Sequence, residues 1–129
     1  SHWGGTSDPG LKLAVFSTGP AVRNPVGNFI CEFISTAILL FVIMFLGANK
    51  YAEGVGPIAV GILILGMGLS FGGPTGYALN PARDLGPRIM HALLPIPGKG
   101  DSDWGYSWIP VVAPVLGGIC GAALASAVL

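Results

Sequence analysis

The sequence Asn80-Pro81-Ala82 combines a helix-capping amide with a proline at the helical position that tolerates proline best. The side-chain oxygen of Asn80 can accept a backbone N–H of the first turn, which leaves the side-chain NH₂ free to donate into a cavity. The start of a helix adds about half a positive charge directed at the same point. Such a site repels cations and hydronium but lets neutral hydroxyl compounds pass, so the pattern favours a filter for neutral solutes.

Arg83 lies within the first turn of the same expected helix, where helix geometry can direct it toward the cavity that Asn80 faces. A fixed guanidinium inside a membrane is expensive unless it has a function. Tyr77 supplies a ring nearby, so Arg83 would hold hydroxyl oxygens while the ring takes the carbon backbone of a polyol. The extended residues before Asn80 would add unpaired carbonyls along the same wall, from Gly76, Tyr77 and Ala78. This combination suits glycerol better than an ion.

These residues belong to a segment, residues 72–94, that is too polar for a lipid-facing helix and too apolar for an ordinary loop. Its glycines and a proline within residues 72–76 are expected to prevent a regular helix from continuing through residue 79. A short helix is predicted from Pro81 to about Leu94. Irregular backbone beside a short helix is tolerated at membrane depth only where it is buried in protein or faces a water-filled cavity. We therefore predict a re-entrant loop with a half-helix.

Three apolar stretches around this segment approach the length that crosses the hydrocarbon core of a membrane, which is about 20 residues. They are residues 25–47, 54–71 and 108–129, and Glu32 is the only charge among them. Gly117 and Gly121 in the third stretch share one helix face and should allow close helix contact. The sequence thus predicts an all-α membrane protein with three spans and one re-entrant loop. Residues 1–24 are predicted to be an extramembrane connection.

Composition also indicates lipid as the main surroundings of the chain. Hydrophobic residues make up 52% of the sequence and charged residues 9%, whereas about a quarter of a soluble domain is charged. Six basic and six acidic residues balance, so no basic surface invites nucleic acid. Cys31 and Cys120 have no Cys or His at metal-ligand spacing, so we expect packing residues, with neither a metal site nor a cofactor. The first long apolar run begins only near Pro25, and no signal peptide is expected.

The longer run Gly76-Tyr77-Ala78-Leu79-Asn80-Pro81-Ala82-Arg83-Asp84-Leu85-Gly86-Pro87-Arg88 resembles the second signature loop of the major intrinsic protein (aquaporin) family. An aspartate directly after the arginine, here Asp84, resembles the pattern of the glycerol-conducting branch, the aquaglyceroporins, rather than that of strict water channels. The run Asp103-Trp104-Gly105-Tyr106 is similar to bacterial glycerol facilitators. From about Leu13 onward the chain resembles the second of the two inverted repeats of this family.

The resemblance implies roles for particular residues. Asn80 would be the central asparagine of the Asn80-Pro81-Ala82 element, and Arg83 the arginine of the outer constriction. Tyr77 stands where phenylalanine is common, and Gly68 would be the small residue that widens the constriction. Two acidic residues would be structural supports, namely Asp84, which shapes the loop, and Glu32, which would hold pore-lining backbone by hydrogen bonds.

The resemblance also implies a function and its surroundings. The chain would be half of a channel, without enzymatic activity, for passive diffusion of glycerol, other small neutral solutes and water. It would need a first repeat to complete the pore, and complete channels would form a homotetramer in the plasma membrane of a bacterium. The N-terminal connection and residues 99–106 would lie outside the cell.

Two other functions fit parts of the pattern. A secondary transporter also uses broken helices at the membrane midplane, and Glu32 would then be a proton-relay acid. A non-conducting membrane fragment is the second alternative, because the first Asn-Pro-Ala element is not in this chain. Simpler interpretations exist for single residues as well: Asn80 as a plain helix cap, Arg83 with Asp84 as a surface ion pair, and His91 as a packing residue rather than a pH gate.

Overall fold

The computed structural model describes residues 2–129, and helices dominate this range. The seven helices are α1 (His2–Gly5), α2 (Pro9–Ala14), α3 (Pro25–Ala48), α4 (Val55–Thr75), α5 (Pro81–Leu93), α6 (Trp104–Ser107) and α7 (Ile109–Val128). Within residues 2–129, three segments are long and apolar enough to cross a membrane: α3, α4, and α6 with α7 taken together as Trp104–Val128. The predicted all-α class with three membrane-length helices is confirmed.

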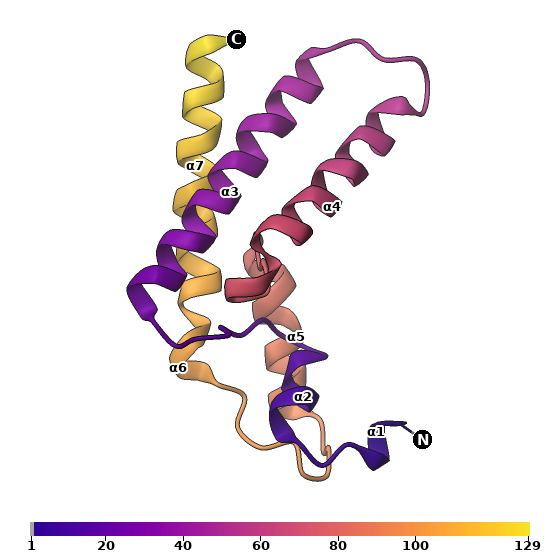
Figure 1. Cartoon of the computed structure of the whole chain (residues 1–129), viewed down its shortest axis with the longest axis vertical. Coiled ribbons are helices and arrows are strands. Elements are labelled where there is room, and N and C mark those ends of the chain that lie inside the picture. The colour runs from indigo at the N-terminus through magenta and orange to yellow at the C-terminus, as the bar shows by residue number, and fades with distance from the viewer. Residues whose placement is uncertain (1) are drawn as a thin grey trace.

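The helices α3 and α7 cross closely in Figure 1 because α7 presents glycines to the backbone of α3. A Cβ added at Gly117 would collide with the carbonyl of Phe33, and one at Gly121 would collide with the carbonyl of Ala37. Residues four apart share a helix face, so both glycines contribute to one line of close backbone contact. The predicted packing role of these two glycines is confirmed.

The helix α4 returns beside α3 after the connection at residues 49–54 and leans away from α7 (Figure 1). One stripe of α4 is almost uncovered in this chain, with Ile58, Ile62, Leu65 and Leu69 each at least 61% exposed. Their spacing of four, three and four residues places them on a single apolar face. In a bilayer this face suits lipid or another apolar helix.

The end of α4 differs from the prediction, because the helix continues through Gly72, Gly73 and Pro74 to Thr75. A proline in the last turn removes one backbone hydrogen bond without breaking the helix before it. The carbonyl of Pro74, which has no partner within the helix at this end, accepts the N–H of Ala21 at 3.0 Å. The helix stops at Gly76, whose φ of 79° is left-handed and suits glycine. The helix thus stops before residue 79, as expected, but it ends four residues beyond the predicted apolar stretch, which closed at residue 71.

The short helix α5 begins after an extended stretch and leads toward the end of the molecule where α1, α2 and residues 94–103 lie (Figure 1). Lys99 stabilises its last turn, because Nζ donates to the carbonyls of His91, Ala92 and Leu94 at 2.6, 2.7 and 2.6 Å. A cation at this position also complements the negative end of the helix dipole. The predicted N-terminal connection contains α1 and α2; Ser1 lies outside the described residues.

Candidate functional site

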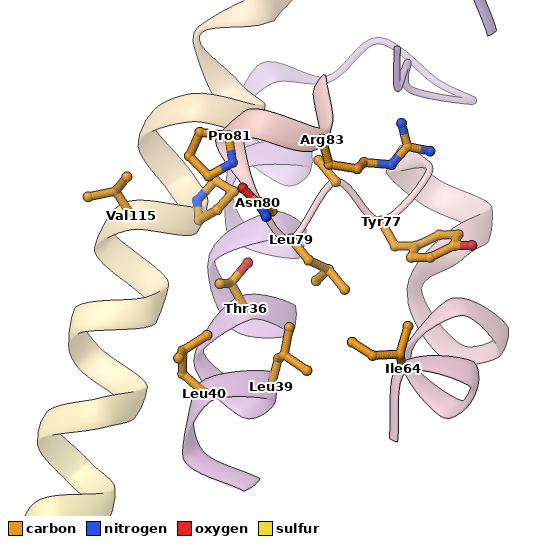
Figure 2. A pocket seen from close by; sticks show the side chains of 12 residues that line it. Thr36, Leu39, Leu40, Ile64, Tyr77, Leu79, Asn80, Pro81, Arg83 and Val115 are labelled. Atoms are coloured by element: carbon orange, nitrogen blue, oxygen red, sulfur yellow. The ribbon is translucent and has the colours of Figure 1, made fainter. Parts of the chain in front are cut away.

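A groove of about 480 Å³ lies where the α4–α5 break meets α3, α4 and α7. Most of its wall is apolar, and the polar groups come from the break, from the first turn of α5 and from Thr36 of α3 (Figure 2). Its lining residues are Thr36, Leu39, Leu40, Ile64, Tyr77, Ala78, Leu79, Asn80, Pro81, Arg83, Pro114 and Val115. A mostly apolar hollow with a few placed polar groups is the usual form of a small-molecule site.

Asn80 caps α5 and keeps a hydrogen-bond donor free. Its Oδ1 accepts the N–H of Ala82 at 2.9 Å, and its backbone is extended, as a cap requires. Its Nδ2 has no hydrogen-bond partner among residues 2–129, and the residue is exposed. The first turn of α5 thus directs both an amide donor and the positive end of a helix dipole at the groove.

Arg83 also lies in this first turn and keeps its charge free. Within the described part of the chain its guanidinium makes no hydrogen bond and no ion pair. In Figure 2 it projects on the same side as the ring of Tyr77, and both residues line the groove. An unpaired guanidinium has five donors for a ligand in the groove. The alternative of an Arg83–Asp84 surface ion pair is wrong, because Asp84 is fully buried and binds Arg88.

The extended stretch before Asn80 has an unusual backbone that Glu32 holds in place. Tyr77 and Leu79 have left-handed φ angles of 41° and 56°, which cost about 1–3 kcal/mol each for residues other than glycine. The fully buried carboxylate of Glu32 accepts the N–H of Ala78 through Oε1 and that of Leu79 through Oε2, each at 3.0 Å. Thr75 donates to the same Oε1 at 2.6 Å. These charge-assisted bonds offset the strain.

The carbonyls of the same stretch are left open. No group among residues 2–129 donates a hydrogen bond to the carbonyl oxygens of Gly76, Tyr77 or Ala78. Backbone acceptors without a partner require water or a ligand. Tyr77 and Ala78 line the groove, whereas Gly76 and Ala82 do not.

Gly68 lies beside the groove rather than in it. It lines an adjacent hollow on α4, and this hollow shares Ile64 and Tyr77 with the groove. A Cβ added at Gly68 would lie 3.2 Å from Cζ of Tyr77. The structure therefore brings Gly68 to the Tyr77 ring, on the α4 side of that ring.

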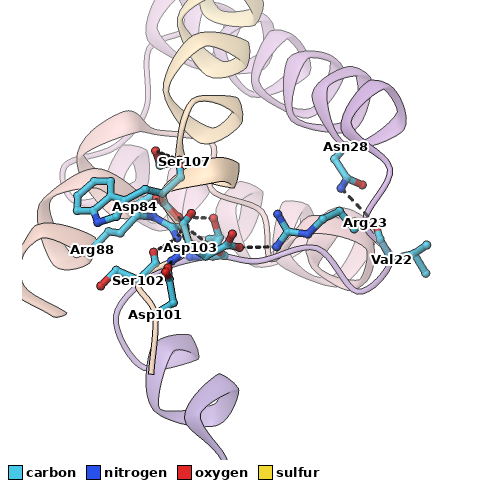
Figure 3. A network of polar contacts seen from close by, with 11 residues as sticks. Val22, Arg23, Asn28, Asp84, Arg88, Asp101, Ser102, Asp103 and Ser107 are labelled. Atoms are coloured by element: carbon cyan, nitrogen blue, oxygen red, sulfur yellow. Dashed lines mark hydrogen bonds and ion pairs between the residues drawn. The ribbon is translucent and has the colours of Figure 1, made fainter. Parts of the chain in front are cut away.

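Asp84 and Arg88 form a buried ionic cluster behind the groove (Figure 3). The Arg88 side chain uses all five N–H groups, on both Asp84 oxygens and on the carbonyls of Thr18, Ser102 and Asp103, at 2.7–3.1 Å. Oδ2 of Asp84 also accepts the N–H and the hydroxyl of Thr18, at 2.8 and 2.6 Å. The cluster ties α5 to the N-terminal connection and to the loop before α6. Arg88 was not among the predicted functional residues, although its position four residues after Asp84 is the spacing of a helical ion pair.

Two further polar contacts stabilise this end of the molecule. Arg23 binds Asp103 at 2.5 Å and lies 5.5 Å from the ring centre of Tyr106, and the hydrogen bond to Asp103 raises the pKa of the guanidinium. His91 is fully buried; its Nδ1 lies 2.8 Å from the Ser102 hydroxyl, and its ring meets Phe16 edge-on. Burial lowers the pKa of His91, and the Lys99 cation lowers it further. The packing interpretation of His91 fits this position.

Comparison with known proteins matches residues 10–125 to the family described as "Major intrinsic protein". The "Probable glycerol uptake facilitator protein" of Thermotoga maritima is 59% identical over 123 residues, which cover 95% of this chain and 53% of that protein. The "Glycerol uptake facilitator protein" of Bacillus subtilis is 57% identical over 120 residues, 93% of this chain and 44% of that protein.

A solved structure agrees with these sequence relatives. The X-ray structure of the aquaglyceroporin from Plasmodium falciparum matches with a TM-score of 0.72 and 34% identity, over 84% of this chain and 47% of that chain. The chain therefore spans about half the length of the curated relatives it matches. The predicted fold, half of an aquaporin-like bundle, is confirmed by this match.

Proposed function

Because this chain belongs to the major intrinsic protein family, we propose that it forms one half of a channel wall for passive diffusion of glycerol, other small neutral solutes and water. It is a multi-pass membrane protein of the glycerol uptake facilitator branch, and this family consists of channels rather than enzymes. The relatives' names specify glycerol uptake. The chemistry of the groove independently supports glycerol as a permeant of this chain.

The observation that carries the proposal is the free Arg83 guanidinium beside the Tyr77 ring, on an otherwise mostly apolar wall. Glycerol has hydroxyl groups along one edge and carbon along the other. Arg83 and the Asn80 amide donate to the hydroxyls, the open carbonyls of Tyr77 and Ala78 accept from them, and the apolar wall contacts the carbons. The charge of Arg83 and the α5 dipole disfavour cations and hydronium in the same passage.

One wall cannot enclose a passage, since Asn80 and Arg83 are exposed in this chain. We therefore expect a first repeat to cover the groove, consistent with relatives about twice as long. The exposed stripe on α4 leaves apolar surface for that half, for lipid or for a neighbouring channel. A homotetramer of complete channels is the expected assembly by analogy with the family, and lipid is the remaining partner.

The test is stopped-flow light scattering on vesicles that contain this chain, a first-repeat half from a glycerol facilitator, or both. We expect rapid glycerol equilibration only with both halves, without accumulation above the outside concentration. Equally fast uptake by this chain alone would contradict the need for a first half. Accumulation driven by a proton or sodium gradient would favour the transporter alternative.

A further inference from the structure

We propose that Gly72 is a positioning residue for solute selection, acting through the ring of Tyr77, an inference that rests on the proposed channel function. Gly72 does not line the groove. Its contribution is the absence of a side chain at the point where the Tyr77 ring meets α4.

The ring of Tyr77 lies against two glycines of α4 that are one helical turn apart. A Cβ added at Gly72 would lie 3.1 Å from Cδ1 and 3.4 Å from Cε1 of the ring. A Cβ added at Gly68 would meet the opposite part of the ring, 3.2 Å from Cζ and 3.4 Å from Cε2. Ordinary carbon contacts are about 3.5–4.0 Å, so neither position has room for a methyl group without movement of the ring.

The backbone of Tyr77 cannot easily move to make that room. Its φ of 41° is left-handed, and the next two N–H groups are bound to the buried carboxylate of Glu32. Gly76 before it is also left-handed and packs against Thr18. A methyl group at Gly72 must therefore be accommodated by rotation of the Tyr77 side chain.

The rotation moves the ring away from α4, and the open space on that side is the groove. Tyr77 lines both the groove and the hollow on α4, and its hydroxyl has no hydrogen-bond partner among the described residues. No polar bond thus fixes the ring against such a shift. Gly72 keeps the ring back against α4, and a larger residue there would narrow the passage beside Arg83.

Gly72→Ala should therefore lower glycerol permeability several-fold and reduce water permeability less, in vesicles that contain both halves of the channel. The permeability to longer polyols such as erythritol should fall by a larger factor than the permeability to glycerol. Gly73→Ala is the matched control, because it lies in the same turn of α4 and an added Cβ meets nothing within 4 Å. Both substitutions change helix propensity equally, so only the contact with the ring differs.

The double variant Gly72→Ala with Tyr77→Ala separates positioning from a general structural effect. Without the ring, Gly72→Ala should leave the glycerol-to-water ratio at the value of Tyr77→Ala alone. An undiminished effect in that background would overturn the proposal, as would equal ratios for Gly72→Ala and Gly73→Ala. Failure of the wild-type channel to conduct glycerol would instead contradict the proposed function.

A readout that needs no conduction tests the position of the ring directly. This chain is labelled with ¹³C at the tyrosine Cε atoms and combined with an unlabelled first half, and Tyr77→Phe assigns the Tyr77 signal. Gly72→Ala should shift that signal, and the signals of Tyr51 and Tyr106 should stay unchanged. Gly73→Ala should shift none of the three. A Tyr77 signal that is the same in Gly72→Ala and wild type would overturn the proposal whether or not the vesicles conduct.

Discussion

Arg88 binds both carboxylate oxygens of Asp84, with Nε 2.7 Å from Oδ1 and Nη2 2.8 Å from Oδ2, and both side chains are fully buried. The same guanidinium reaches the carbonyl of Thr18 from the N-terminal connection and that of Ser102 from the loop before α6. One residue of the half-helix thus fixes two segments that are distant in sequence. Arg83, the unpaired arginine in the groove, lies on the same helix, α5, and Arg88 anchors that helix.

Asp84→Asn should destabilise the folded chain by about 3–5 kcal/mol, because it leaves the buried Arg88 charge without its partner. The measurement is equilibrium unfolding in mixed micelles, compared with Glu53→Gln. Glu53 is exposed and makes no hydrogen bond among the described residues, so the same loss of a carboxylate charge should be nearly neutral there. Equal stability of the two variants would show that the ion pair contributes little.

Glu32→Gln should loosen the stretch that carries the open carbonyls. A glutamine amide has one acceptor oxygen where the carboxylate has two, so the N–H of Ala78 or of Leu79 loses its partner. Each lost charge-assisted bond costs about 1.5–3 kcal/mol. Hydrogen exchange at these two amides should become faster, while exchange in the middle of α7 should not change. Unchanged protection of both amides would contradict the role given to Glu32.

Local signals made Asn80 and the three apolar helices predictable from the sequence. A cap followed by proline acts within one turn, and membrane-length apolar runs need no knowledge of distant residues. The backbone carbonyls that Arg88 and Lys99 bind were not predictable in this way, because the fold brings them near. The Asp84 partner of Arg88 could have been found from its spacing of four residues. The end of α4 was misjudged because a proline one residue before the end of a helix removes one bond without stopping the helix, and the carbonyl that it leaves at the helix end is satisfied by Ala21, 53 residues earlier in the chain.

His91 should make the folded chain less stable in acid. Its pKa is lowered by burial first and by the Lys99 charge second, with a smaller effect of Arg88 in the same direction, while a hydrogen bond with the Lys99 backbone and the Asp101 charge oppose the shift. The unfolded chain therefore binds more protons than the folded chain from the lowered pKa up to about 6.5. Stability should fall as the pH falls through that window, because protonated His91 needs an acceptor at Nε2 and has none among the described residues.

The measurement for His91 is thermal unfolding from about pH 5 to about pH 8, the range in which histidine charge changes. His91→Gln keeps a polar group near Ser102 and cannot be protonated, so its stability should depend less on pH. Phe16 and Ser102 are uncharged neighbours and contribute no titration of their own in this range. If His91→Gln and wild type lose the same amount of thermal stability as the pH falls, the effect belongs to other titrating groups.

Arg83→Val should damage selectivity more than folding, in vesicles that contain both halves. The Arg83 guanidinium has no partner among the described residues, so its loss leaves no buried group unpaired and should change stability little. Removal of the cation lowers the electrostatic barrier to protons and small cations, and the smaller side chain widens the passage beside Tyr77. Proton leak should therefore rise.

Arg83→Lys retains the charge and tests the donor geometry separately. A lysine ammonium lacks the planar fork that meets two neighbouring hydroxyl oxygens at once, so glycerol permeability should fall relative to water while proton leak stays near the wild-type value. The two variants thus separate charge from shape at one position. Stopped-flow glycerol and water permeability and a pH-sensitive dye report the three quantities at matched protein density. If Arg83→Val leaves proton leak and the glycerol-to-water ratio unchanged, Arg83 does not face the permeant and the groove is not the pore wall.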